Sequence, residues 1–356
     1  MTAPAVAFHA VGKRYGPVTA VDAVSFEIAP ATLVTLLGPS GCGKTTTLRL
    51  IAGLEQPSAG RIDIDGHDVT HLSAAERDVS MVFQSYALFP HMTVLENVCY
   101  GLRAGGIKRA PAEEMAAAKL ATVGLSGFER RLPSELSGGQ QQRVAVARAI
   151  VLEPKVLLFD EPLSNLDAKL RRRVREDIRA LQHDLRLTVV YVTHDQEEAL
   201  AVSDRIIVMH SAAIVQDGTP RDLYERPANR FIADFIGNAN LLPVTITREG
   251  DMAHVSLAGS TLRLPHRDLP NGRADLAVRP EAIRVHARPA ATGQIAGHIR
   301  KAAYLGGHME YEVALDGVPG EVFVTDRDVL TPLGVGAEVG VSFAPAGATL
   351  VAAAPK

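Results

Sequence analysis

The sequence predicts an α/β core with a mostly parallel sheet, a helical subdomain inserted at about 85–150, and a small all-β domain after the core. Between residues 33 and 209, apolar runs alternate with helical patterns, as in sheets that are covered on both faces. After residue 84, prolines and glycines interrupt this pattern before helical spacing resumes. Beyond residue 237, short alternating segments between Gly, Pro and Asp-Gly turns predict strands of a small barrel or paired barrel.

A glycine-rich loop follows the first buried strand pattern, Leu33–Leu37, and precedes a helical pattern. Residues Gly38–Thr45 fit G-x-x-x-x-G-K-[ST] at every fixed position. Such a loop offers backbone N–H groups to phosphate oxygens, and the helix N-terminus adds a positive dipole end. The sequence therefore predicts a nucleoside triphosphate site. Its expected residues are Gly38, Ser40, Gly41, Cys42, Gly43, Lys44, Thr45 and Thr46.

Three residues of the loop have distinct expected properties. Lys44 reaches the β- and γ-phosphates in this motif, and the Thr45 hydroxyl ligates Mg²⁺. Cys42 is either a reactive thiol near a helix N-terminus or a small residue that the loop tolerates, and we favour the second interpretation.

Composition limits the class of protein. At 356 residues the chain predicts two domains, which we divide into 1–236 and 237–356. The net charge of −3 argues against broad nucleic-acid binding, and two cysteines suit a reducing compartment. We find neither a signal-peptide pattern nor an apolar run of about 18 residues, so we expect no membrane span.

Polar residues that could take part in catalysis or metal binding follow three further buried strand patterns. One strand pattern ends at Gln84, another at Asp160 and Glu161, and a third just before His194. Two carboxylates at the end of a buried strand are costly unless they serve a cation. Because open α/β sheets bind ligands outside the carboxyl ends of their strands, we expect these side chains to converge beside the glycine-rich loop.

Two features allow alternative interpretations from the local sequence. Asp167 is placed to cap a helix that runs to about Leu185, and the basic run Arg171–Arg173 lies on this helix. We favour a solvated helix face for the run over a nucleic-acid patch. Tyr15, between two predicted antiparallel strands, is interpreted locally as an exposed turn residue.

The segment LSGGQQQR at 136–143 carries a family resemblance. Together with the glycine-rich loop and VLLFDEP at 156–162, it resembles the ATPase subunits of ABC transporters. VFQSYALFPHMTVLENV at 82–98 resembles bacterial importer ATPases, and RPEAIRV at 279–285 resembles their C-terminal oligonucleotide-fold (TOBE) regulatory domain. The resemblance extends over the whole chain without a departure in the core motifs.

The resemblance implies roles for the residues at the strand ends. Asp160 holds Mg²⁺ with Thr45, and Glu161 is the general base that polarises the attacking water. Gln84 contacts Mg²⁺ or the water and senses the γ-phosphate. His194 binds the γ-phosphate and holds the hydrolytic geometry.

The resemblance also implies an ATP-bridged homodimer. Tyr15 matches the aromatic residue that stacks on adenine in this family. Ser137, Gly139 and Gln140 match residues that meet the γ-phosphate bound on the opposite subunit, and Asp167 resembles a residue that crosses the interface. Hydrolysis removes the γ-phosphate charge that both chains neutralise, so the pair opens.

Membrane partners are a further implication of the family. Tyr86, Leu88 and Phe89 are expected to line a groove for a short helix of a transmembrane permease, although they could instead be core residues. The protein would then lie on the cytoplasmic face of the inner membrane and act indirectly with a periplasmic or surface substrate-binding protein. No nucleic-acid partner is expected.

The cargo is the least specific implication. FIGNANLLPV at 235–244 and YLGGHMEYEV at 304–313 look closest to ATPases of ferric-iron, polyamine and aminophosphonate (2-aminoethylphosphonate) importers, with maltose-type sugar importers as the alternative. A soluble ABC ATPase of DNA repair or ribosomes is less favoured, because such proteins usually have two cassettes or a long coiled coil. A non-enzymatic nucleotide-regulated module conflicts with intact Lys44, Asp160, Glu161 and His194.

Overall fold

The computed structural model describes residues 3–164, 166–287 and 293–353. The chain divides into two compact units, Met1–Pro220 and Arg221–Lys356. The short helices α7 (Pro220–Glu225) and α8 (Arg230–Phe235) lie at the start of the second unit. The functional division that we placed after residue 236 stays a prediction.

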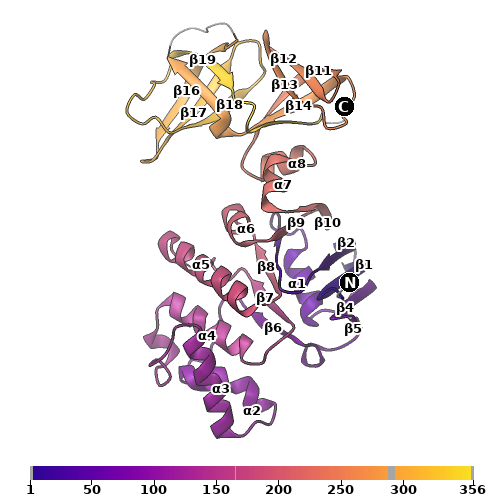
Figure 1. The fold of residues 1–356 in the computed structure, drawn as a ribbon, viewed down its shortest axis with the longest axis vertical. Coiled ribbons are helices and arrows are strands. Elements are labelled where there is room, and N and C mark those ends of the chain that lie inside the picture. Colours follow the sequence, from indigo (N-terminus) through magenta and orange to yellow (C-terminus); the bar gives the residue numbers. More distant parts are fainter. Residues whose placement is uncertain (1–2, 165, 288–292, 354–356) are drawn as a thin grey trace. The chain divides into compact units, whose positions relative to one another are not determined.

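A six-stranded sheet organises the first unit (Figure 1). Five strands are parallel, and the edge strand β10 pairs antiparallel with β9. The predicted buried strands are all present, whereas β10 was not expected. In spatial order the strands are β10 (Ala213–Gly218), β9 (Arg205–His210), β3 (Leu33–Leu37), β8 (Val189–Thr193), β7 (Val156–Asp160) and β6 (Val79–Val82).

The two faces of this sheet bury different partners, because successive side chains of a strand point to opposite sides. Leu158 and Val190 pack in the cluster that contains helix α1 (Lys44–Ala52). Phe159 and Tyr191 pack in the cluster that contains the helical subdomain and α5. The antiparallel sheet on the α1 side comprises β2 (Val18–Ile28), β1 (Val6–Tyr15), β4 (Ala59–Ile64) and β5 (His67–Asp68).

The chain between β6 and β7 is helical, as the sequence predicted (Figure 1). We did not predict the first of its helices, because Gly101 was interpreted as a helix breaker. Thr93 and Glu96 form a reciprocal capping box at its start, and this Thr-x-x-Glu spacing is the signal that could have revealed it. The helices of the first unit after α1 are α2 (Val94–Ala104), α3 (Arg109–Thr122), α4 (Gly138–Ile150), α5 (Ala168–Leu185) and α6 (Gln196–Val202).

The second unit contains two five-stranded antiparallel sheets that share one hydrophobic core, which confirms the predicted all-β domain. Strands β16, β19 and β20 were not expected. The first sheet comprises β13 (Ser260–Pro265), β12 (Met252–Leu257), β11 (Asn240–Glu249), β14 (Gly272–Val278) and β20 (Ala348–Ala352). The second comprises β15 (Ile283–Ala287), β19 (Glu338–Phe343), β16 (Ile295–Tyr304), β17 (Met309–Leu315) and β18 (Glu321–Asp326).

Among the described residues, no helix combines the length and the apolar character needed to cross a membrane.

Asn97 of α2 fixes the loop that leads out of β6. Its side chain is fully buried, donates to the carbonyls of Phe89, Met92 and Thr93, and accepts from the N–H of Phe89. Replacing Asn97 by Ala leaves these buried groups without partners, so we expect a loss of about 1–3 kcal/mol in stability. Thermal unfolding of the full chain measures it, with exposed Glu114→Ala on α3 as the control. An unchanged transition in Asn97→Ala would contradict this interpretation.

Candidate nucleotide site

The glycine-rich loop passes close to two neighbouring backbones. Gly38 has φ of 157°, and a Cβ there would lie 2.1 Å from the carbonyl oxygen of Met209. Gly43 has φ of 105°, and a Cβ there would lie 2.4 Å from the carbonyl oxygen of Ala20. Only glycine fits at both positions. The loop therefore has its shape because β9 on one side and β2 on the other leave no space for side chains.

Lys44 and Cys42 lie on the inner side of this loop. The Nζ atom of Lys44 donates to the carbonyl oxygens of Gly38 at 2.7 Å and Pro39 at 2.9 Å. Cys42 is buried, with its Sγ 3.8 Å from the same Nζ, which supports the interpretation of a small tolerated loop residue. Ser40 and Gly41 lie exposed on the outer side of the loop.

Thr45 and Asp160 place two oxygen atoms side by side. The Thr45 hydroxyl donates to Oδ1 of Asp160 at 3.4 Å, across the ends of α1 and β7. Burial raises the pKa of Asp160, because partial removal from water disfavours the charged carboxylate. A hydroxyl and a half-buried carboxylate supply the oxygen ligands that hard divalent cations prefer, so this pair fits Mg²⁺ chemically.

Glu161 and His194 form the second pair, at the ends of the adjacent strands β7 and β8. Nδ1 of His194 lies 3.1 Å from Oε2 of Glu161. Glu161 has φ of 45°, a left-handed conformation that is uncommon for a residue with a side chain and concentrates at functional sites. The His194 side chain is 58% exposed, so it remains accessible to a ligand.

Ser164 links Gln84 to Glu161. The Gln84 side chain donates to the Ser164 hydroxyl at 2.9 Å, and this hydroxyl donates to the Glu161 carbonyl at 3.1 Å. The structure thus brings together the predicted residues from the ends of β6, β7 and β8. We assigned no role to Ser164, because its link to Gln84 depends on the pairing of strands far apart in the sequence.

The segment Leu136–Arg143 begins helix α4, on the sheet face opposite α1. Ser137 caps the helix, its hydroxyl accepting from the Gln140 N–H, while the Gln140 side chain accepts from the Ser137 N–H. A Cβ on Gly139 would lie 3.0 Å from a methyl of Leu170, so the glycine lets α4 approach α5 closely. The structure does not bring Ser137, Gly139 and Gln140 together with the glycine-rich loop within this chain.

Asp167 and Tyr15 lie at the edges of the site. Asp167 caps α5 by accepting from the Leu170 N–H at 3.0 Å, which confirms the predicted N-cap. Tyr15 ends β1 with its ring 45% exposed and the Lys13 Nζ 4.8 Å from the ring centroid. Burial and a hydrogen bond from the Tyr15 hydroxyl to Glu55 raise the pKa of Tyr15. The exposed ring is compatible with both interpretations of this residue.

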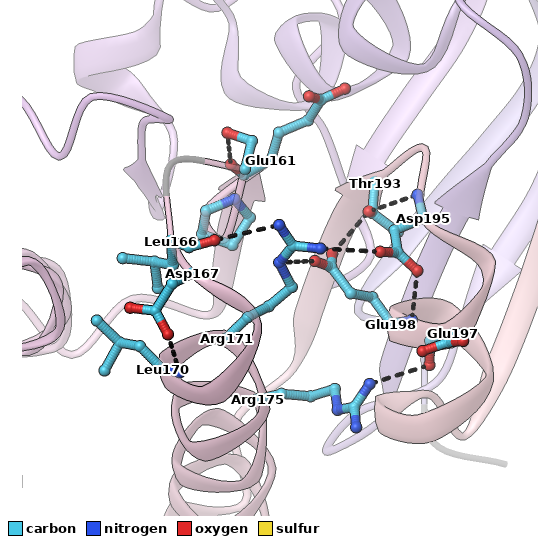
Figure 2. A network of polar contacts seen from close by, with 12 residues as sticks. Glu161, Leu166, Asp167, Leu170, Arg171, Arg175, Thr193, Asp195, Glu197 and Glu198 are labelled. Carbon is cyan, nitrogen blue, oxygen red and sulfur yellow. Dashed lines mark hydrogen bonds and ion pairs between the residues drawn. The ribbon is translucent and has the colours of Figure 1, made fainter. Parts of the chain in front are cut away.

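The basic run on α5 is split between solvent and protein. Arg172 and Arg173 are exposed, as predicted, whereas Arg171 points inward and contacts Asp195 and Glu198 (Figure 2). The prediction of a solvated face was therefore wrong for Arg171. Arg171 lies three and seven residues before the buried Val174 and Ile178, which places it on the inner face of the helix. This spacing could have predicted its position, but we considered only the run of charges.

A groove of about 430 Å³ lies between β6, α2 and α4. Phe89, Tyr100 and Arg148 line it; the Phe89 and Tyr100 ring centroids are 4.6 Å apart, and Arg148 donates to the Ala87 carbonyl. Burial lowers the pKa of Arg148. Tyr86 and Leu88 instead belong to the core, so the expected groove position holds for Phe89 alone.

Comparisons with known proteins identify the family of the chain. Residues 21–164 match the ABC transporter family, and residues 276–351 match the TOBE domain. A Rhizobium etli protein described as "Fe(3+) ions import ATP-binding protein FbpC" is 58% identical over 97% of both chains. Proteins of the same description from Brucella abortus, at 57% identity over 97% of both chains, and Escherichia coli, at 52% over 86% of both chains, are also similar.

A solved structure supports the fold alone. CbiO1 from Clostridium perfringens, described as part of the ABC transporter complex CbiONQ, has a TM-score of 0.59 at 24% identity. It covers 63% of this chain and 92% of its own. Taken with the relatives that match along nearly the whole sequence, the family is clear: the chain belongs to the ATP-binding proteins of ABC transporters.

Proposed function

We propose that this protein hydrolyses ATP to drive an ABC importer of ferric iron, as a homodimer attached to membrane subunits. The observation that carries the ATPase proposal is the meeting of two pairs, Thr45 with Asp160 and Glu161 with His194, at neighbouring strand ends. One pair suits a cation and the other suits an acid–base step. They lie beside a loop built to accept phosphate.

Binding of ATP depends on the glycine-rich loop and Tyr15. The N–H groups of Gly38–Thr46 and the positive end of α1 accept the phosphates, and Lys44 leaves its loop carbonyls to bind the β- and γ-phosphates. Thr45 and Asp160, with Gln84 nearby, hold Mg²⁺, which neutralises phosphate charge when bound. The exposed Tyr15 ring stacks on adenine.

Hydrolysis depends on Glu161 and His194. Glu161 takes the proton of the attacking water, and His194 holds the γ-phosphate in place. The Gln84–Ser164–Glu161 chain supports this arrangement, because a change at Gln84 reaches the backbone of the base through two hydrogen bonds. Gln84, which senses the γ-phosphate in this proposal, is thereby linked to the general base.

Each ATP lies between two chains in this proposal. Ser137, Gly139 and Gln140 form a helix N-terminus that suits an anion, with Ser137 exposed, on a different face of the sheet from the glycine-rich loop. One chain cannot use both for one γ-phosphate, whereas two chains arranged head to tail can. Asp167, exposed at the start of α5, contacts the partner.

The groove beside Phe89 suits an apolar helix end of a permease subunit. Its exposed Phe83, Tyr100 and Leu152 are large apolar side chains that water would not favour. It adjoins Gln84, so it connects the nucleotide site to the permease on the cytoplasmic face of the inner membrane. A binding protein delivers cargo to that permease, and the C-terminal unit, which matches the TOBE domain, has a regulatory role.

Ferric iron is the proposed cargo because the relatives that match along nearly the whole chain are described as ferric-iron import proteins. Polyamine, aminophosphonate and sugar importers, which we also considered, have no such support here. The chain's own residues do not contact cargo in this proposal.

We expect Glu161→Gln to bind ATP but to lower turnover by about 10²-fold or more, because the amide cannot accept the proton from water. Retained ATP should also hold the dimer closed. Steady-state hydrolysis, ATP binding and light scattering measure the three effects. Exposed Glu176→Gln on α5 is the matched control and should behave as wild type. Undiminished hydrolysis in Glu161→Gln would remove Glu161 from the role of base.

Mixing two inactive variants tests the shared site. Lys44→Ala disables the loop, and Ser137→Arg disables the opposing helix end, so each variant alone should be inactive. In a mixed pair, one site combines an intact loop with an intact helix end. We expect the mixture to recover at most about one quarter of wild-type activity, because about half of random pairs are mixed and each has one intact site. No recovery, although mixed pairs form, would contradict the shared site.

Cargo is tested with the complete transporter in liposomes. We expect a binding protein loaded with ferric iron to stimulate ATP hydrolysis, because coupling requires the loaded form to favour the closed state. The same complex offered spermidine, 2-aminoethylphosphonate or maltose with their binding proteins should stay at the basal rate. Stimulation by one of these three and not by ferric iron would overturn the cargo proposal and leave the ATPase proposal intact.

A further inference from the structure

Arg171 is bound to two segments that carry site residues (Figure 2). Its Nη2 donates to the carbonyl of Leu166 at 3.1 Å, and Leu166 directly precedes Asp167. Its Nη1 donates to Oδ2 of Asp195 at 3.4 Å, and Asp195 directly follows His194. A single guanidinium therefore joins the start of α5 to the turn that presents the histidine.

Glu198 completes the network from the far side of the turn. It is 4% exposed, and its Oε2 accepts from the Thr193 hydroxyl at 2.7 Å. The same hydroxyl accepts from the Asp195 N–H at 3.0 Å. Both chain neighbours of His194 are thus held by groups that Arg171 faces.

Charge makes Arg171 essential to this arrangement. Asp195 and Glu198 are two carboxylates on one helical turn, and burial together with the Asp195 charge raises the pKa of Glu198. Without the guanidinium, two like charges would face each other in a poorly solvated space. The turn before α6 would then shift, and His194 would shift with it.

Arg175 is a neighbouring arginine that links the same helices without contacting the residues beside His194. Arg175 lies one turn further along α5 and donates to the carbonyl of Glu197 on α6 at 3.4 Å. It joins the same two helices, but in Figure 2 it contacts neither Leu166 nor Asp195. If Arg171 only linked the two helices, replacing Arg171 or Arg175 by Ala should change kcat equally.

The network has space to tighten. The buried Nε of Arg171 has no hydrogen-bond partner among the described residues, and it lies 3.8 Å from Oε1 of Glu198, beyond hydrogen-bond distance. Arg171 also lines a cavity of about 80 Å³ whose other lining residues include Glu161 and His194. An inward shift of the start of α5 would bring the Arg171 Nε within hydrogen-bond distance of Oε1 of Glu198.

We propose, building on the function proposed above, that Arg171 is a positioning residue for hydrolysis. It holds the turn of His194 in register with the segment of Asp167, and so keeps His194 against Glu161. Closure of the partner chain on Asp167 is transmitted through Arg171 to the histidine. Within the part of the chain that the structure describes, Arg171 binds Leu166, Asp195 and Glu198 and not the phosphate-binding loop, so its effect is on turnover and not on ATP affinity.

The test compares variants of the full chain in steady-state hydrolysis and equilibrium ATP binding. For Arg171→Ala and Glu198→Gln we expect kcat to fall about tenfold or more with KM and ATP affinity changed less than about twofold. Arg171→Lys should be intermediate, because an ammonium keeps the charge but lacks the fork that also reaches Leu166. Arg175→Ala, the matched control, should retain wild-type kcat. The kcat of the double variant Arg171→Ala/Glu198→Gln should be no lower than that of the more impaired single variant, because both substitutions break the same network.

Three results would overturn the proposal: wild-type kcat in Arg171→Ala, an equal loss in Arg175→Ala, or full rescue by Arg171→Lys. Thermal unfolding is recorded for each variant; if Arg171→Ala fails to fold, Arg171→Lys and Glu198→Gln decide the question. Failure of the proposed function looks different, because the wild-type chain itself would not hydrolyse ATP. Failure of the positioning role leaves wild-type hydrolysis intact.

Discussion

The parallel register of the central sheet is the constraint on which the site depends. Leu37 of β3 pairs with Thr193 of β8, and Asp160 of β7 pairs with Val192 of β8. In these pairings the last residues of three strands lie at one edge, so the chain that leaves each strand begins at the same level. The glycine-rich loop, the Asp160–Glu161 pair and His194 are neighbours for this reason, although His194 follows Gly38 by 156 positions in the sequence.

Much of this was predictable because parallel buried strands have a strong apolar pattern and their ends are marked by polar residues. The strand ends, the cap at Asp167 and the all-β second unit followed from such local signals. The helix α2 was missed because Gly101 was interpreted as a helix breaker and the capping box was overlooked. Strand β10 was missed because a partly exposed edge strand carries little apolar pattern. Strand β16 lies inside its sheet, but its second half is mostly exposed and does not show the alternating pattern. Ser164 and Arg171 could not be assigned from neighbouring residues, since their partners come from other strands and helices.

Arg171 illustrates how a charge pattern can mislead. Three consecutive arginines resemble a solvated surface, and two of them are exposed. A helix, however, turns each residue by about 100°, so a run of three must spread over most of the circumference. The one on the Val174–Ile178 side faces the protein, where the carboxylates of Asp195 and Glu198 compensate its charge. Those carboxylates belong to the segment that presents His194, which connects an apparent surface feature to the chemistry.

The central claim is that one complete ATP site requires two chains. Hydrogen exchange of the full-length Glu161→Gln variant, with and without Mg-ATP, tests it directly at the backbone N–H groups involved. We expect protection of residues 38–46 in all ATP-bound samples, and protection of the amides of Gly138 and Gly139 only at concentrations at which the dimer forms. Protection confined to 38–46 at every concentration, in samples shown to be dimeric, would contradict it.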